Sequence, residues 1–323
     1  MSSILSDRVQ KVKPSATMAV SDKAKELKSQ GIQIVSMGSG EPDFDTPANI
    51  QKAAVKAIGA GETRYTPADG TPELKKAICE KFKRENGLDY SATEVMVSCG
   101  GKQVFYNLCQ AILNEGDEVI IPTPYWVSYP DMAILADATP VFIEAGLDQD
   151  FKITPDQLEA SITPKSKLFV LNSPSNPTGS VYSRSEIVAL GEVLERHPHV
   201  LTISDDIYEH IRWGEDDFVN IAMACPNLKE RVVILNGVSK AYAMTGWRIG
   251  YAAGPEAVIK AMKKIQGQST SNPSSISQAA ALEAITGDQS FISMMVEAFE
   301  RRHEFLVTSL NEIDGIECPR SGG

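Results

Sequence analysis

Short apolar runs that alternate with helical stretches are the feature that most constrains the fold of this 323-residue chain. From residue 118 onward, runs typical of strands occur at 118–121, 139–143, 167–171, 201–205, 232–235 and 248–253. Helical spacing separates several of them, at 128–136, 156–162 and 184–196. This alternation is typical of a mainly parallel sheet buried on both faces. The sequence therefore predicts an α/β fold, with ligands at the carboxyl ends of the strands.

The rest of the chain adds helices around this core. Helical patterns are expected at 18–29, 48–60, 71–86, from the glycines at 100–101 to about 113, and at 256–268, 274–286 and 289–313. Further strands are expected at 32–37 and 94–98, and a strand is expected to begin just before residue 319.

Composition excludes several classes of protein. With 31 basic and 42 acidic residues the net charge is −11, which argues against binding to nucleic acid or to an anionic membrane. No leader-like start or membrane-length apolar run occurs, so neither secretion nor membrane insertion is expected. The cysteines are odd in number and their spacing fits neither a zinc site nor a disulfide framework, which favours a reducing cytoplasm: Cys79, Cys99, Cys109, Cys225 and Cys318.

Lys240 is the most informative single residue. It lies among small residues in an irregular loop between two apolar runs. A lysine enclosed by buried strands must have its charge matched or removed, and its neutral amine can form an imine with a carbonyl. Arg248, eight positions later, is a candidate cationic neighbour and phosphate clamp.

A second candidate anion site lies at residues 100–102. Gly100 and Gly101 follow a predicted strand and precede a predicted helix, so free backbone N–H groups and the helix dipole converge there. The spacing to Lys102 is not that of a nucleotide-binding P-loop, and an ordinary tight turn is the alternative.

Several polar and aromatic residues follow other predicted strands. Asp205 and Asp206 close one strand, and their spacing to His210 reproduces no known metal ligand set, so no metal is expected. Trp126 lies just past another strand end, where an indole can stack on a flat ring. Asn176 lies in a proline-rich loop, where it could also serve only the turn.

The lysine loop resembles a known signature. Ser239, Lys240, Gly246, Arg248 and Gly250 stand at the offsets of class I pyridoxal-phosphate aminotransferases, closest to the bacterial aspartate aminotransferase branch, whose members often also accept prephenate. The resemblance implies fold type I, with a mostly parallel seven-stranded sheet between helices and a smaller α+β domain. It also implies a pyridoxal 5'-phosphate cofactor and a homodimer with shared active sites. The implied reaction moves an amino group between aspartate or glutamate and a 2-oxo acid, 2-oxoglutarate or oxaloacetate, with prephenate as a further possible acceptor.

The resemblance assigns roles to individual residues. Those implied to bind the cofactor are Lys240, Gly100, Gly101, Trp126, Asn176, Asp205, Tyr208, Ser239, Arg248 and, from the neighbouring subunit, Tyr65. Lys240, Asp205 and Tyr208 are implied to be catalytic. Those implied to bind the substrate are Gly40, Trp126, Asn176, Lys102 and Lys13, the two lysines having a nearly equal alternative as solvated side chains. Gly237 departs from relatives that place a phosphate-binding serine there, which puts that contact in doubt.

The resemblance also predicts a division into domains. Residues 1–45 are expected to start the small domain, residues 46–287 to form the large cofactor-binding domain, and residues 288–323 to supply a long helix and the start of a small C-terminal domain. The family's substrate-binding arginine beyond this point has no counterpart, so the chain is expected to be truncated. The alternatives left open are another fold type I enzyme, a β-lyase or a decarboxylase, and a catalytically impaired cofactor-binding fragment.

Overall fold

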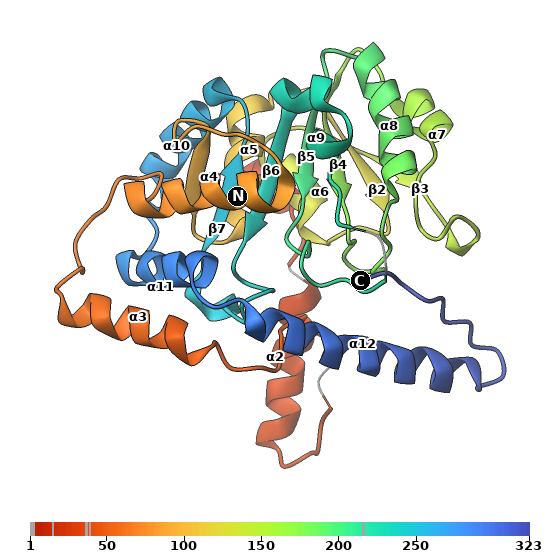
Figure 1. The fold of residues 1–323 in the computed structure, drawn as a ribbon. Helices are drawn as coiled ribbons and strands as arrows, with labels where there is room; N and C mark the ends of the chain where they lie inside the picture. Colours follow the sequence, from red (N-terminus) through yellow and green to blue (C-terminus); the bar gives the residue numbers. More distant parts are fainter. Residues whose placement is uncertain (1–3, 15, 36–37, 39, 215–216) are drawn as a thin grey trace.

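A seven-stranded sheet forms the centre of the molecule (Figure 1). The computed structural model describes residues 4–14, 16–35, 38, 40–214 and 217–323. The strands are β1 (Val95–Ser98), β2 (Glu118–Thr123), β3 (Thr139–Glu144), β4 (Ser166–Asn172), β5 (Leu201–Asp205), β6 (Val232–Gly237) and β7 (Gly250–Ala253). Their order is β1-β7-β6-β5-β4-β2-β3, and only β7 runs antiparallel to its neighbours. The predicted α/β class and mostly parallel sheet are confirmed.

Helices surround the sheet, close to the predicted positions. They are α1 (Asp7–Lys11), α2 (Ala16–Ser29), α3 (Ala48–Gly59), α4 (Pro72–Asn86), α5 (Gly101–Ile112), α6 (Ser128–Leu135), α7 (Pro155–Ser161), α8 (Arg184–Arg196), α9 (Ile221–Ala224), α10 (Glu256–Ser269), α11 (Ser275–Thr286) and α12 (Ser290–Asn311). Figure 1 shows α12 and α2 beyond one end of the strands. Among the described residues, none of the helices combines the length and the apolar character needed to cross a membrane.

Both faces of the sheet are buried, as the continuous apolar runs predict. In β4, Leu168 and Val170 belong to one apolar cluster, and the alternating Phe169 and Leu171 belong to the other. Side chains of α5, α6 and α10 complete the first cluster, and those of α4, α8 and α11 complete the second. Each fully buried aliphatic or aromatic side chain stabilises the fold by about 1.5–3 kcal/mol relative to an exposed one. The sheet is therefore a stable support for the loops at the ends of its strands.

Local signals explain where elements begin and end. The Thr71 hydroxyl accepts a hydrogen bond from the backbone N–H of Leu74, and Pro72 occupies the first turn of α4. Gly87 ends the same helix at φ 66°, a left-handed conformation that glycine adopts without strain.

Three strand predictions were wrong in whole or in part. Residues 32–35 form no strand, and Val35 is 87% exposed, because an apolar run without a neighbouring edge to pair with gains nothing from extension; residues 36 and 37 lie outside the described part. The tail after α12 is irregular, and the Trp213 indole holds it by donating to the carbonyl of Ser321 at 2.8 Å. Arg248 lies outside β7, with a left-handed backbone.

Candidate active site

Most of the predicted site residues lie next to strand ends that meet at one edge of the sheet. The parallel strands β2, β4, β5 and β6 end there, and so does β1, because β7 is antiparallel to both β1 and β6. For the same reason β7 begins at this edge, and Ser98 of β1 pairs with Gly250 of β7. This topology brings together segments that are more than 100 residues apart in sequence, as the rule for open α/β sheets predicts.

Lys240 lies in the loop after β6 at the centre of this edge. Its Nζ donates a hydrogen bond to the carbonyl of Gly40 and lies 5.6 Å from the centre of the Tyr208 ring. Desolvation lowers the pKa of Lys240, and the charge of Arg248 adds to this, against the opposing influence of Glu41 and Asp205. A lysine of this kind supplies neutral amine more readily than a solvated one.

Asp205 ends β5 as a buried acid, with 3% of its surface exposed. The Tyr129 hydroxyl donates to Asp205 Oδ2 at 2.6 Å, and the backbone N–H of Ile207 donates to Oδ1 at 3.3 Å. Burial raises the pKa of Asp205 to about 6, although the Tyr129 hydrogen bond favours the ionised form. A cation placed against this carboxyl would therefore be held strongly.

Tyr208 and Asn176 meet between the ends of β4 and β5. Burial raises the pKa of Tyr208 to about 12, while a hydrogen bond with the Asn176 side chain opposes the shift. The loop of Asn176 is fixed from below, since Asn172 Oδ1 accepts from the Asn176 backbone N–H at 2.8 Å and Asn172 Nδ2 donates to the Asp205 carbonyl at 2.9 Å. The neutral phenol is thus placed beside the Lys240 amine.

Arg248 lies against the turn that starts α5. The backbone of Gly100 has φ 87°, and a Cβ at Gly100 would overlap the Arg248 guanidinium. A Cβ at Gly250 would overlap the backbone of the same turn. The guanidinium is held by donation from Nη1 to the Thr245 carbonyl at 2.8 Å. A guanidinium beside the N-terminus of the 12-residue helix α5 makes a combined anion site.

Trp126 and Lys102 form the side of the site near β2. Lys102 Nζ lies 5.1 Å from the centre of the Trp126 ring, and Trp126 contacts Tyr129 edge to face at 5.2 Å. Desolvation and the charge of Arg248 lower the pKa of Lys102. The Trp126 indole and the Lys102 ammonium group therefore lie next to the anion site formed by Arg248 and the N-terminus of α5.

Three predicted residues have no side-chain hydrogen bond, ion pair or ring contact with this group among the residues that the structure describes. Ser239 is buried beside Lys240 in sequence, and no side-chain hydrogen bond of its hydroxyl is found in the described part of the chain. Tyr65 is 91% exposed, and Lys13 is exposed between α1 and α2. No hydrogen bond, ion pair or ring contact joins Tyr65 or Lys13 to another predicted site residue within the described ranges. The structure thus brings together the residues after the strand ends and leaves these three without a visible role.

Sequence reasoning missed two residues at the centre of the site. Tyr129 binds Asp205 although the two stand 76 residues apart, and Glu41 accepts a hydrogen bond from the Thr245 hydroxyl near Lys240. Tyr129 occupies a buried position of α6, where the sequence predicts only packing in the core. Nothing in the local sequence indicates that its hydroxyl has a partner. Glu41 stands next to the predicted Gly40, and this adjacency was the available clue.

Comparison with known proteins identifies the family. Residues 32–323 match the model of aminotransferase class I and II. The chain is 58% identical over 319 residues to an aspartate/prephenate aminotransferase of Cereibacter sphaeroides and equally to one of Nitrosomonas europaea, covering 99% of this chain and 80% of each relative. The chain belongs to the class I and II aminotransferases.

Solved aminotransferases share the fold described above. The aspartate aminotransferase of Rhizobium meliloti superposes with a TM-score of 0.96 at 50% identity, over 99% of this chain and 80% of that one. The Thermus thermophilus aspartate aminotransferase with maleate superposes with a TM-score of 0.95 at 45% identity, over 99% and 83%. The expected fold type I and transferase activity are confirmed.

Aminotransferases of this family use pyridoxal phosphate in general, and the residues present here fit that group. The set offers an amine of lowered pKa in Lys240, a buried carboxyl in Asp205, and a cradle of Gly100, Gly101 and Arg248 in which added side-chain atoms would collide. These match an aldehyde, a pyridine nitrogen and a phosphate respectively.

Proposed function

We propose that this aminotransferase moves an amino group between aspartate or glutamate and a 2-oxo acid, with pyridoxal phosphate attached to Lys240. The observation that carries the proposal is the Lys240 amine, with its pKa lowered by desolvation, 5.6 Å from the Tyr208 ring and on the same sheet edge as Asp205. When bound, pyridoxal phosphate supplies a reactive aldehyde and an electron-withdrawing pyridine ring.

The chain's own residues would hold and orient the cofactor. Arg248 and the Gly100–Gly101 turn would bind its phosphate, as a guanidinium and a helix N-terminus bind anions elsewhere. Gly101 would supply the free N–H group, since the Gly100 N–H donates to the Ser98 carbonyl at 2.8 Å and Gly100 would leave room for the phosphate. Asp205 would hold a proton on the pyridine nitrogen through a charge-assisted contact of about 1.5–3 kcal/mol. Ser239 and Trp126 remain further proposed contacts, to the phosphate and the ring face.

Proton transfer is proposed for Lys240. Desolvation lowers the pKa of the free Lys240 amine, so it is neutral more readily than a solvated lysine and can accept a proton at the substrate α-carbon and return it elsewhere. Tyr208 and Asn176 would stabilise a phenolic oxygen of the cofactor, since the neutral Tyr208 hydroxyl can donate a hydrogen bond there.

A dicarboxylic substrate is favoured by the cations around the site. Lys102 lies over Trp126 beside Arg248. The Cereibacter relative is named for aspartate and prephenate, and the Thermus aspartate aminotransferase structure was solved with maleate. We infer that Lys102 binds the distal carboxylate and that Gly40 forms part of the pocket floor. Prephenate is the second candidate substrate, and Lys13 a further proposed contact.

We also propose a homodimer with shared active sites in the cytoplasm. The support for the dimer is Tyr65, a residue that is 91% exposed and could reach a neighbouring subunit's phosphate. The support for a reducing compartment is that all five cysteines are free.

The proposed division into domains has support from contacts between the two ends of the chain. Phe44 contacts Phe291 and Phe299 of α12 edge to face, at 6.0 and 5.7 Å. Arg302 of the same helix pairs with Asp43 at 2.7 Å. We therefore keep residues 1–45 and 288–323 as parts of one smaller domain beside the large domain at 46–287.

A half-reaction tests this function directly. Protein saturated with pyridoxal phosphate is mixed with aspartate in the absence of any oxo acid, and its absorption spectrum is followed. The proposal predicts conversion to the spectrum of the pyridoxamine form and release of oxaloacetate in equal amount. A bound yellow cofactor that aspartate and glutamate leave unchanged would contradict it.

A further inference from the structure

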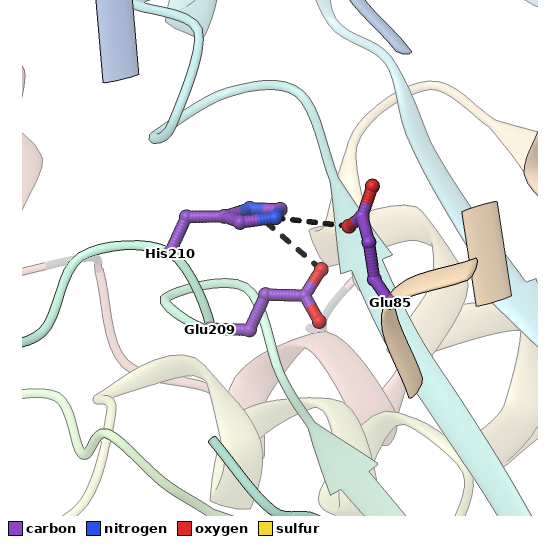
Figure 2. Close-up of side chains that lie close together, drawn as sticks. All are labelled: Glu85, Glu209 and His210. Carbon is purple, nitrogen blue, oxygen red and sulfur yellow. Dashed lines mark hydrogen bonds and ion pairs between the residues drawn. The ribbon is translucent and has the colours of Figure 1, made fainter. Parts of the chain in front are cut away.

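Glu209, which is not among the predicted site residues, is a buried acid whose carboxylate accepts several hydrogen bonds. Figure 2 shows Glu85, Glu209 and His210 together, with the imidazole facing both carboxylates. Glu209 is 5% exposed, and His210 Nε2 lies 3.0 Å from Glu85 Oε2. In the sequence, the only feature that links Glu209 to the site is that it directly follows Tyr208.

A cation from the protein already occupies this cluster. Lys81 of α4 is 1% exposed, and its Nζ donates to Glu209 Oε1 and, at 2.9 Å, to Asn86 Oδ1. The same Nζ lies 3.4 Å from Glu85 Oε2. Burial opposes ionisation of Glu209, but the charge of Lys81 prevails and lowers its pKa. The cluster is therefore an internal ion pair, and a metal would have to displace the ammonium group.

Glu209 also connects the two segments that carry the active site. Asn236 Nδ2, near the end of β6, donates to Glu209 Oε1 at 2.7 Å. Asn236 Oδ1 in turn accepts from the backbone N–H of Gly237 at 2.7 Å, at the start of the loop that leads to Lys240. Glu209 follows Tyr208 directly, so one carboxylate ties the segment of Tyr208 to the loop of Lys240.

We propose that Glu209 is a positioning residue that fixes the Lys240 amine relative to the Tyr208 ring through Asn236, with Lys81 balancing its buried charge. This inference rests on the proposed roles of Lys240 and Tyr208. Its physical basis is that catalytic groups must be held within a fraction of an ångström by contacts that do not themselves touch the substrate. In this account the acceptor oxygen on residue 209 matters more than the charge.

Two double variants separate the acceptor from the charge. Lys81→Met with Glu209→Gln removes both charges but keeps an oxygen that can accept from Asn236 Nδ2. Lys81→Met with Glu209→Met removes both charges and the acceptor at similar volume. Both double variants remove the buried pair of Lys81 and Glu209 as a whole, so neither member is left as an unpaired buried charge, which is the usual reason that breaking such a pair unfolds a protein. Glu85 also loses Lys81 in both variants and keeps its contact with His210, so this loss is matched between them.

Hydrogen exchange of the cofactor-free protein gives a readout independent of catalysis. In the Glu209→Met double variant we expect amides 237–240 to exchange at least tenfold faster, with little change in β4. In the same variant we expect kcat for aspartate to fall about 10- to 100-fold with KM within about threefold, because alignment and not binding is lost. The Glu209→Gln double variant should restore kcat to within about fivefold of wild type and exchange to near wild type.

Asn236→Ala provides a second route that leaves the ion pair of Lys81 and Glu209 in place. It should reproduce both the faster exchange of residues 237–240 and the fall in kcat. Wild-type exchange and kcat in Asn236→Ala, or equal exchange and kcat in the two double variants, would overturn the proposal. If wild-type protein transfers no amino group, the proposed function fails, while the exchange comparison still decides the positioning role.

Discussion

Asp205 shows how a functional residue is held at the expense of stability. Its carboxyl is buried, and burial raises its pKa to about 6 from an ordinary value of 3.8. The folded-state pKa lies above the unfolded value, so the stability contributed by this group is greatest at acid pH and is lost as pH rises from about 4 to 6. At neutral pH the carboxylate therefore weakens the cofactor-free fold while it prepares a site for a cation.

Asp205→Asn should separate these two effects. An amide does not ionise, so we expect the free energy of unfolding of the cofactor-free protein to rise by about 1–2 kcal/mol at pH 8, with a smaller gain at pH 5. The amide cannot hold a proton on a pyridine nitrogen, so kcat should fall at least 10- to 150-fold. Urea unfolding at the two pH values and steady-state kinetics measure this. A variant less stable than wild type at pH 8 would contradict the account.

Sequence reasoning found the residues whose chemistry depends on local order. Lys240 and Arg248 share one loop, so their spacing is visible in the sequence, and the structure brings both to the same edge. Tyr129 and Glu209 act through partners 76 and 128 positions away, Asp205 and Lys81, and no local pattern reports such a contact. A tyrosine at a buried helix position is interpreted as a core residue unless the partner of its hydroxyl is known.

At the scale of elements, one buried amide joins α10 to the sheet. Gln266 is fully buried, and its Nε2 donates to the carbonyls of Val97 and Ala68, while its Oε1 accepts from Asn107 Nδ2 at 2.9 Å. The carbonyl of Ala68 belongs to the loop that follows Tyr65. Gln266 therefore fixes the route of the segment proposed to reach the partner subunit.

Gln266→Leu should destabilise the fold strongly. The change leaves two buried carbonyls and one amide without partners, so we expect the free energy of unfolding to fall by about 2–4 kcal/mol in urea titrations. Gln268→Leu is the matched control, because Gln268 lies on the same helix and is exposed. The control should change stability by no more than about 0.5 kcal/mol. Equal effects of the two substitutions would contradict the role given to Gln266.

The contact between α4 and the segment after β5 should be sensitive to acid. Partial burial disfavours the Glu85 carboxylate, but the hydrogen bond from His210 and the charge of Lys81 hold its pKa at about 2, below the ordinary 4.5. A lowered folded-state pKa gives stability that is present above about pH 4.5 and is lost as pH falls toward 2.

Glu85→Gln should remove part of this acid sensitivity. At pH 5.5 the variant should be less stable than wild type by about 1 kcal/mol, allowing for solvent screening, and the difference should shrink by pH 3.5. Urea unfolding at both pH values measures it. Glu80→Gln on the same helix, where the side chain is 59% exposed, serves as the control. A difference that grows as pH falls would show that the sign is wrong.

Strands were predicted correctly where both faces of the strand are buried in the sheet, and incorrectly where an apolar run has no partner strand. The centres of β4 and β6 are buried on both faces, so the consecutive apolar side chains at 168–171 and 232–235 predicted the strands correctly. The run at 32–35 is also mostly apolar, but it has no neighbouring strand among the described residues, and the tail after α12 is held by Trp213 and not by a sheet. Pairing partners depend on the whole fold, which a local run does not contain.

At the scale of the whole molecule, the proposed shared site can be tested by mixing inactive chains. Lys240→Ala lacks the proposed attachment point, and Tyr65→Ala lacks the proposed contact from the partner, which should weaken cofactor binding about 10- to 150-fold. In a mixed dimer, the site with Lys240 receives Tyr65 from the other chain and is complete.

Unfolding and refolding the two variants together at equal amounts should therefore restore activity. Random pairing makes about half of the dimers mixed, each with one complete site, so about a quarter of wild-type activity is expected at limiting cofactor. Each variant refolded alone should stay low. A mixture no more active than the sum of its parts would show that Tyr65 serves its own subunit or none.

The central claim is that one amine, that of Lys240, holds the cofactor. The most direct measurement is to incubate the protein with pyridoxal phosphate, reduce it with borohydride, digest it and locate the pyridoxyl group by peptide mass spectrometry. The account predicts one stoichiometric label on the peptide that contains Lys240, and none in Lys240→Ala. A label on another lysine such as Lys102, or the absence of stoichiometric labelling, would contradict it.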